Sequence, residues 1–297
     1  MADFVLGQHP LLKKVFLDRR IKDFTANGFV ADQLFTNISV DALAIKFSQY
    51  DPETNQDGSM KLDDVPEVGE GSNYDRIGLS EEQKTELIKK YGLEFAVTYE
   101  MQKFGQAGQI ERGLRRLGGN ILGMVDEMAY KVATQNYTIT GGIQGKTKTD
   151  DQWNDPTNGA ENMIADLVDA KKALKDYGYF ADTVVINPEQ EAQLIKNKNI
   201  RDAFRQNNTD VALLRGYIGD FMGLSFIVDS HFQADNALIL QKKVIGDIAD
   251  AEPLRTVTYN EDSNERTIVR ATRFTNAYLT DPKAVYLLKG LNAPAGN

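Results

Sequence analysis

The 297-residue sequence contains no cysteine and only two histidines. The absence of cysteine excludes disulfide bonds and thiolate metal sites. A catalytic or metal centre built on histidine would have to use His9 or His231, which lie far apart in the sequence. No GxSxG, HExxH or GxGxxG motif is present, so no nucleophile, general base or oxyanion site is indicated. We therefore expect no cofactor, no metal site and no enzymatic activity.

Long apolar runs are also missing. No stretch approaches the roughly 18 apolar residues that a membrane span requires, and the first residues do not show the basic start and apolar core of a signal peptide. We expect no membrane partner and a chain that is made and kept in the cytoplasm until any assembly leaves the cell. The net charge of −9 argues against sequence-independent DNA binding, which depends on Lys and Arg neutralising phosphates.

The negative charge is concentrated in one segment. Residues 51–86 hold eleven acidic and three basic residues, which is a net charge of −8 in an eighth of the chain. Because such a segment needs basic partners, we expect contacts between subunits in which its carboxylates meet arginines and lysines. The acidic candidates are Asp63, Asp64, Glu67 and Glu70, and the basic candidates are Arg112, Arg115, Arg116, Lys13, Lys14, Arg19 and Arg20. The alternative is a solvated acidic tip that contacts nothing.

Residues 105–136 carry the strongest helical pattern. Apolar residues recur every three or four positions and line one face of a helix. They are Ile110, Leu114, Leu117, Ile121, Met124 or Val125, Met128 and Val132. Four glycines, at 113, 118, 119 and 123, oppose a helix by roughly 1 kcal/mol each relative to alanine. Tertiary packing must therefore hold the helix, and we expect the glycines to allow a close approach of other elements or a bend.

A protruding hairpin is expected before this helix. Residues 40–50 alternate as a strand, and so does KKYGLEFAVTYEM at 89–101. Between them, residues 51–82 have few apolar residues, four glycines and two prolines, so they cannot bury enough surface to fold alone. Residues 44–99 thus read as a hairpin with an acidic, flexible tip.

The second half of the chain alternates helices and strands. We expect a helix from Asn158, with Glu161 completing a capping box, an apolar stripe and a stop at Gly178. The stripe is Ile164, Leu167, Val168 and Leu174. A strand at 182–187 and a helix from Pro188 follow. Further strands are expected at 224–229, 236–241, 255–260, 266–274 and 285–290, before a tail that frays.

Two short motifs suggest ligands but lack the structural context that the ligand would need. Gly145-Lys146-Thr147 resembles the end of a phosphate-binding loop, but Thr140 replaces the first glycine and no apolar helix follows. Residues 53–64 match part of the spacing of a calcium loop, but the acids at its first and last positions are exchanged and no helices flank it. We expect neither nucleotide nor calcium binding.

Taken in order, these parts resemble the major capsid proteins of tailed bacteriophages, the Hong Kong 97 fold. The resemblance covers nearly the whole chain, although no single motif is diagnostic. The most similar stretches are KKYGLEFAVTYEM, ADTVVINPEQEAQLIKN, GYIGDFMGLSFIVDS and RFTNAYLTDPKAVYLLKG. The resemblance implies an α+β fold with an N-terminal arm, an extended hairpin called the E-loop, a peripheral domain with a long spine helix, and an axial domain.

The implied domain boundaries follow from this order. Residues 1–43 would be the arm, 44–99 the E-loop, 100–157 with 251–290 the peripheral domain, 158–250 the axial domain and 291–297 a flexible tail. Some members of the family join lysines of the E-loop to asparagines of neighbours. Lys61 and either Asn260 or Asn264 lie in plausible regions, but no motif matches, so we do not expect crosslinks.

The resemblance also implies partners and a location. The chain would form hexamers and pentamers of an icosahedral shell that encloses double-stranded DNA without sequence-specific contact. It would be part of the virion and would assemble in the cytoplasm of a host bacterium. A portal protein is implied, and a decoration protein is left open. A separate scaffolding protein is implied as well, since the spine begins near residue 105 and leaves no room for a fused scaffolding segment before the arm. Two alternatives remain at this point: an encapsulin-type nanocompartment shell, and a soluble α+β enzyme or binding module.

Overall fold

The computed structural model describes residues 30–52, 55, 60–61, 65–74, 76, 81–104, 107–155, 157–196 and 220–292. The chain divides into two compact units, each built from segments that are distant in sequence. The first contains residues 1–45, 85–130 and 247–278, and the second contains residues 46–84, 131–246 and 279–297. Within the described residues, no helix is long and apolar enough to cross a membrane.

The first unit contains a four-stranded sheet in the order β1-β10-β11-β4. Its strands are β1 (Thr36–Ser39), β10 (Gly246–Glu261), β11 (Arg266–Leu279) and β4 (Lys89–Thr98), and the short helices α2 (Ala31–Leu34) and α3 (Tyr99–Lys103) flank β1 and β4 in sequence. β1 is parallel to β10, and β4 is antiparallel to β11. A 3-10 turn, η2 (Asp262–Asn264), connects β10 to β11.

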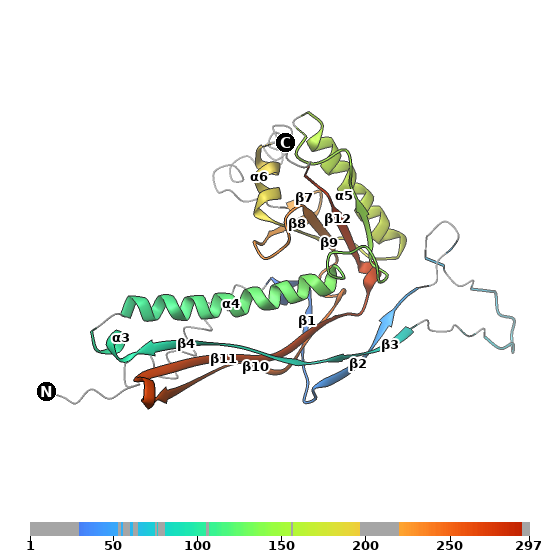
Figure 1. Ribbon diagram of the computed structural model, residues 1–297. Helices are drawn as coiled ribbons and strands as arrows, with labels where there is room; N and C mark the ends of the chain where they lie inside the picture. Colours follow the sequence, from blue (N-terminus) through green and yellow to red (C-terminus); the bar gives the residue numbers. More distant parts are fainter. Residues whose placement is uncertain are drawn as a thin grey trace. The chain divides into compact units, whose positions relative to one another are not determined.

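The long helix expected from the sequence is α4 (Ala107–Ala133), which runs alongside this sheet (Figure 1). The predicted stripe from Ile110 to Val125 is buried, and its part from Ile110 to Ile121 packs against Val97, Val269 and Ala271 of β4 and β11. Beyond Val125 the prediction was wrong by one position. The buried residues there are Ala129, Tyr130 and Ala133, whereas Met128 and Val132 are only half buried.

A close approach between helix and sheet explains one of the four glycines. A Cβ atom at Gly113 would lie 2.1 Å from Cζ of Phe95 on β4, so only glycine leaves room for the ring. By contrast, a Cβ atom at Gly119 would meet nothing within 4 Å. The apolar stripe outweighs the helix-breaking cost, because burying one Leu or Ile side chain stabilises by about 1.5–3 kcal/mol, against about 1 kcal/mol lost per glycine.

The expected hairpin starts as a two-stranded sheet of β2 (Ala44–Tyr50) and β3 (Glu81–Leu87). Exposed and half-buried residues alternate along most of β2, as the sequence predicts. At the base of the pair, Ile88 N donates a hydrogen bond to Leu43 O (2.9 Å) before the chain continues into β4.

The second unit contains a six-stranded sheet in the order β5-β12-β9-β6-β8-β7. Its strands are β5 (Gln144–Thr147), β12 (Val285–Lys289), β9 (Asn236–Leu240), β6 (Thr183–Ile186), β8 (Leu224–Val228) and β7 (Asp220–Phe221). The helices are α5 (Gly159–Asp176) and α6 (Pro188–Lys196), with the short turn η3 (Pro282–Ala284) before β12. The sequence grouping placed 285–290 with the spine helix, whereas β12 pairs with β9 and β5 in this sheet. The domain boundaries themselves stay a prediction.

The ends of α5 follow the sequence only in part. The Asn158 side chain makes no capping hydrogen bond, so the predicted capping box is wrong. Instead, Oδ1 of Asp155 accepts from the backbone N–H groups of Thr157 (2.7 Å) and Asn158 (3.2 Å). The predicted stop at Gly178 is confirmed: it has φ +81°, and Tyr179 N donates back to Leu174 O (3.0 Å).

The buried face of α5 also differs from the predicted stripe. Ile164 and Val168 are exposed, while Leu167 and Leu174 are buried as expected. The buried line has regular spacings of three and four residues, and it consists of Ala160, Met163, Leu167, Ala170 and Leu174. The prediction mixed two helix faces because it counted only large apolar residues and passed over the alanines that face the core.

Candidate assembly surfaces

The outer face of α4 carries the arginines that the sequence nominated. Arg112, Arg115 and Arg116 are all exposed, because Arg112 falls between the buried positions Ile110 and Leu114, and the other two fall between Leu114 and Leu117. Backbone geometry therefore presents three guanidinium groups within about one and a half turns of one helix. Guanidinium groups match carboxylates with paired hydrogen bonds, so this face suits an acidic partner.

The acidic candidates are described only in part. Glu67 and Glu70 are exposed, whereas Asp63 and Asp64 lie outside the described residues. The basic candidates of the arm, Lys13, Lys14, Arg19 and Arg20, also lie outside them, as do His9 and most of the calcium-like spacing. The pairing of acidic and basic groups thus stays a prediction.

Exposed apolar residues on the hairpin were missed by the sequence reasoning. Val65 is 88% exposed and Tyr74 81% exposed, on either side of a turn in which Ser72 N donates to Gly69 O (3.0 Å). At the base of the hairpin, Leu43 and Leu87 are exposed as well. A partner surface that covered these side chains would remove their apolar area from water, which is favourable. The signal was present in the sequence as isolated apolar residues within an acidic segment.

Exposed residues of the first unit place charged side chains next to aromatic rings. On β4 and β11, Arg270 Nε donates to Glu94 Oε1 (2.5 Å), and its guanidinium lies 5.0 Å from the centre of the Tyr259 ring. These side chains are partly exposed to solvent, so each contact contributes little to stability. Phe104, just after α3, is 70% exposed and has the Lys103 ammonium group 5.9 Å from its ring.

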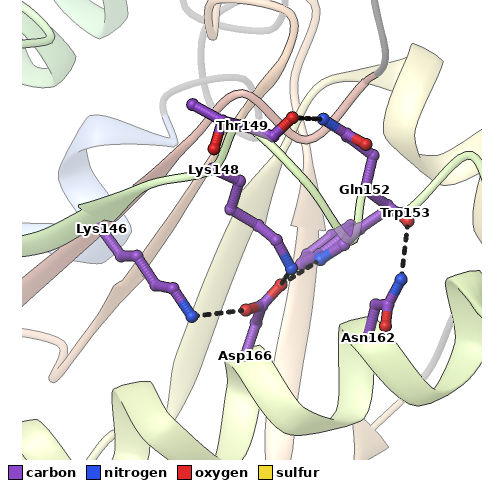
Figure 2. A network of polar contacts seen from close by, with 7 residues as sticks. All are labelled: Lys146, Lys148, Thr149, Gln152, Trp153, Asn162 and Asp166. Atoms are coloured by element: carbon purple, nitrogen blue, oxygen red, sulfur yellow. Dashed lines mark hydrogen bonds and ion pairs between the residues drawn. The ribbon is translucent and has the colours of Figure 1, made fainter.

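The Gly-Lys-Thr motif has a structural role instead of a phosphate-binding one. Residues 144–147 form strand β5, paired in parallel with β12, and so do not form a loop at a helix N-terminus. Figure 2 shows the neighbouring network around Asp166 of α5. Its Oδ2 accepts from Lys148 Nζ (2.5 Å) and from Trp153 Nε1 (2.8 Å), while Lys146 Nζ lies 3.8 Å from Oδ1.

The centre of this network, formed by Lys148, Asp166 and Trp153, is almost completely removed from water, whereas the Lys146 side chain is exposed. The side chains of Lys148 and Asp166 are 4% and 2% exposed, and Trp153 is buried in the core of the second unit. Burial, with the nearby negative charges of Asp169 and Asp166, also raises the pKa of Tyr286. Since Lys148 and Trp153 bond to one oxygen of the Asp166 carboxylate and Lys146 lies near the other, the cluster holds the loop after β5 against α5.

The described histidine is likewise accounted for locally. Asp229 Oδ1 accepts from the backbone N–H of His231 (2.9 Å) and lies 2.9 Å from Nδ1 of its ring. A turn of this kind is a common structural use of aspartate.

Comparison with known proteins decides the family. A family model described as phage capsid protein matches residues 81–288, which is most of the chain. The chain belongs to the phage capsid protein family. No curated protein sequence matches this capsid protein significantly.

Solved structures share the fold of this capsid protein at low sequence identity. A virus-like particle from Pyrococcus furiosus has a TM-score of 0.62 and 14% identity, with 92% of this chain and 98% of that chain covered. The mature capsid of bacteriophage PhiM1 has a TM-score of 0.61 and 12% identity, with 90% and 88% covered. The Mycobacterium phage Bobi structure has a TM-score of 0.61 and 13% identity, with 91% and 92% covered. The predicted Hong Kong 97-like α+β fold is confirmed.

Proposed function

We propose that this capsid protein is the major shell subunit of a tailed phage with double-stranded DNA. The observation that carries the proposal is the match of the fold over nine-tenths of the chain to a mature phage capsid, together with the family match over residues 81–288. Copies of the chain would form hexamers and pentamers of an icosahedral head. The role is structural, as a component of the virion, and we infer no catalysis.

The surfaces of the subunit support repeated contacts between copies. Closed shells reuse one heterologous contact at every symmetry-related position, so each exposed group acts many times over. The exposed arginines of α4 and the acidic hairpin with its exposed Val65 and Tyr74 provide polar and apolar parts of such a contact. The net charge of −9 supports a shell that encloses DNA without binding it tightly.

The finer parts of the proposal concern partners and place of assembly. We infer assembly in the cytoplasm of the bacterial host, with a separate scaffolding protein and a portal protein, and we leave a decoration protein open. Co-expression with neighbouring genes tests these partners: a scaffolding partner should change the size or uniformity of the particles, and a portal partner should copurify at low stoichiometry.

Electron microscopy of the expressed full-length chain tests the central proposal. Closed shells of uniform diameter are the expected result, and a 33.1 kDa monomer under all conditions in size-exclusion chromatography would contradict it. The alternative of an encapsulin-type nanocompartment is favoured by the similarity to a virus-like particle that is not named as a phage. Particles purified from the native source separate the two proposals, since one holds DNA and the other an enzyme.

A further inference from the structure

The hairpin is tied to the second unit of its own subunit just where β2 ends. Tyr50 N donates to Thr280 O (2.9 Å), and Gln49 Nε2 donates to Leu279 O (3.1 Å). Gln49 is only 6% exposed, and its Oε1 accepts a hydrogen bond from Lys84 Nζ on β3. One buried amide therefore bridges β3 and the last residue of β11.

A second contact lies ten residues farther along the hairpin. Met60 N donates to Asp176 O (3.3 Å), at the last residue of α5. The last four carbonyl groups of a helix have no partner within it, so Met60 satisfies one of them. Met60 itself is half buried, and its O accepts from Asn55 Nδ2 (3.3 Å).

The turn after α5 forms a firm support next to these contacts. Tyr179 OH donates to Asp281 Oδ1 (2.8 Å), which joins this turn to the segment that receives Tyr50. Lys283 Nζ lies 5.1 Å from the centre of the Tyr177 ring. Since Tyr50 bonds to Thr280 and Tyr179 bonds to the adjacent Asp281, the end of β2 lies close to this turn. Burial, together with the negative charges of Asp51 and Asp176, raises the pKa of Tyr177 there.

We propose that Gln49, Tyr50 and Met60 form a clasp that fixes the root of the hairpin on its own subunit. The clasp stays closed in the free subunit and in the shell, and the acidic part beyond Met60, including the exposed Glu67 and Glu70, is the part offered to a neighbouring copy. The proposal rests on the proposed shell function for its consequence, but the clasp itself does not depend on it.

The clasp has a physical purpose. A hairpin whose root is already fixed loses less conformational entropy when its outer part binds a neighbour. It also points the acidic residues in one direction, so that the same contact is repeated in every subunit. The clasp would thus divide residues 51–82, which the sequence predicts as an acidic, flexible tip, at Met60.

Hydrogen exchange on the full chain, before and after assembly, tests the clasp. In the free subunit, the amides of Tyr50 and Met60 should exchange roughly tenfold or more slowly, after correction for intrinsic rates, than those of Glu67 and Glu70. In particles, the amides of Tyr50 and Met60 should keep their protection, and those of Glu67 and Glu70 should gain it. Equal exchange of all four in the free subunit would overturn the clasp.

A matched pair of variants isolates the buried amide. Gln49→Leu keeps the volume but removes both side-chain hydrogen bonds, and it should speed exchange at Tyr50 by roughly tenfold and slow particle formation. Glu67→Gln, on the exposed part of the hairpin, should leave exchange at Tyr50 unchanged. Trp153 fluorescence during unfolding should match the parent in both variants, showing that the second unit is folded. Unchanged exchange at Tyr50 in Gln49→Leu would contradict the proposal.

The outcomes separate the clasp from the shell function. Protection of Tyr50 and Met60 without any particle formation supports the clasp and contradicts the proposed function. Normal particles in which the amides of Tyr50 and Met60 are unprotected support the proposed function and contradict the clasp.

Discussion

The two units of this capsid protein use their β-sheets in different ways. In the second unit, β6 and β9 are buried at every position, and their sequences TVVI and NALIL are nearly continuous apolar runs. In the first unit, the first part of β11, RTIVRATRF, mixes buried apolar residues with arginines. Arg270 of this strand pairs with Glu94 of β4, and both side chains are exposed. The second sheet is an ordinary covered core, whereas the first offers one face to α4 and the other to solvent.

This difference indicates that the two sheets have different roles, one in folding and the other in assembly. A sheet buried on both faces stabilises its unit but has no surface to give to a partner. A sheet buried on one face, next to a helix with exposed arginines, leaves large surfaces available for contacts in a shell. We therefore expect substitutions in the second unit to change folding, and substitutions on the outer surfaces of the first to change assembly.

The largest effect is expected in the second unit at Asp166. Asp166→Ala leaves Lys148 buried without a partner, and breaking a buried pair in this way typically costs about 3–5 kcal/mol. The free energy of unfolding should fall by an amount of that order, measured by denaturant titration with Trp153 fluorescence as the probe. Lys148→Met with Asp166→Leu removes both charges and should cost much less. Equal losses in the single and double variants would show that packing, and not the charge pair, holds this loop.

A smaller effect is expected where α4 meets the sheet of the first unit. Gly113→Ala places a methyl group against the Phe95 ring, and overpacking of this kind costs about 1–3 kcal/mol. Gly119→Ala is the matched control on the same helix, with free space around the new methyl group, and should stabilise by up to about 1 kcal/mol. Thermal unfolding of both variants measures the difference. If the two substitutions shift the melting temperature alike, helix propensity alone decides and the close approach of Phe95 does not matter.

The sequence predicted the elements with strong periodicity better than their exact faces and caps. The stripe of α4 was correct from Ile110 to Val125, because large apolar residues mark it. It failed near Ala129 and Ala133, where burial depends on the surrounding structure and not on side-chain size. The Asn158 side chain does not cap α5; the Asp155 side chain instead holds the turn that precedes the helix, and the loop geometry that decides this cannot be seen in the sequence.

Pairing between distant segments was the hardest feature to predict. Nothing in VYLLKG shows that β12 lies between β5 and β9, because a short apolar strand fits the core of either unit. The network at Asp166 could not be predicted for the same reason. Lys148 and Trp153 lie in a polar stretch of the sequence before α5, and they meet Asp166 only through the fold. The arginines of α4 could be predicted as exposed, because helical periodicity alone fixes the face on which they lie.

The smallest free-energy change per contact is expected on the outer surface of the first unit. Each exposed ion pair there would contribute only about 0–1 kcal/mol, but a shell repeats the set at every subunit, so the sum can decide assembly. Arg115→Glu with Arg116→Glu should therefore leave unfolding of the subunit unchanged and block particle formation, seen by size-exclusion chromatography and electron microscopy. Asp63→Lys with Asp64→Lys in the same chain should partly restore particles if these groups meet between copies. Close pairs should persist at physiological salt, where screening acts beyond about 8 Å. If both double variants form particles like the parent at low and high salt, the acidic tip is only solvated and contacts no basic partner.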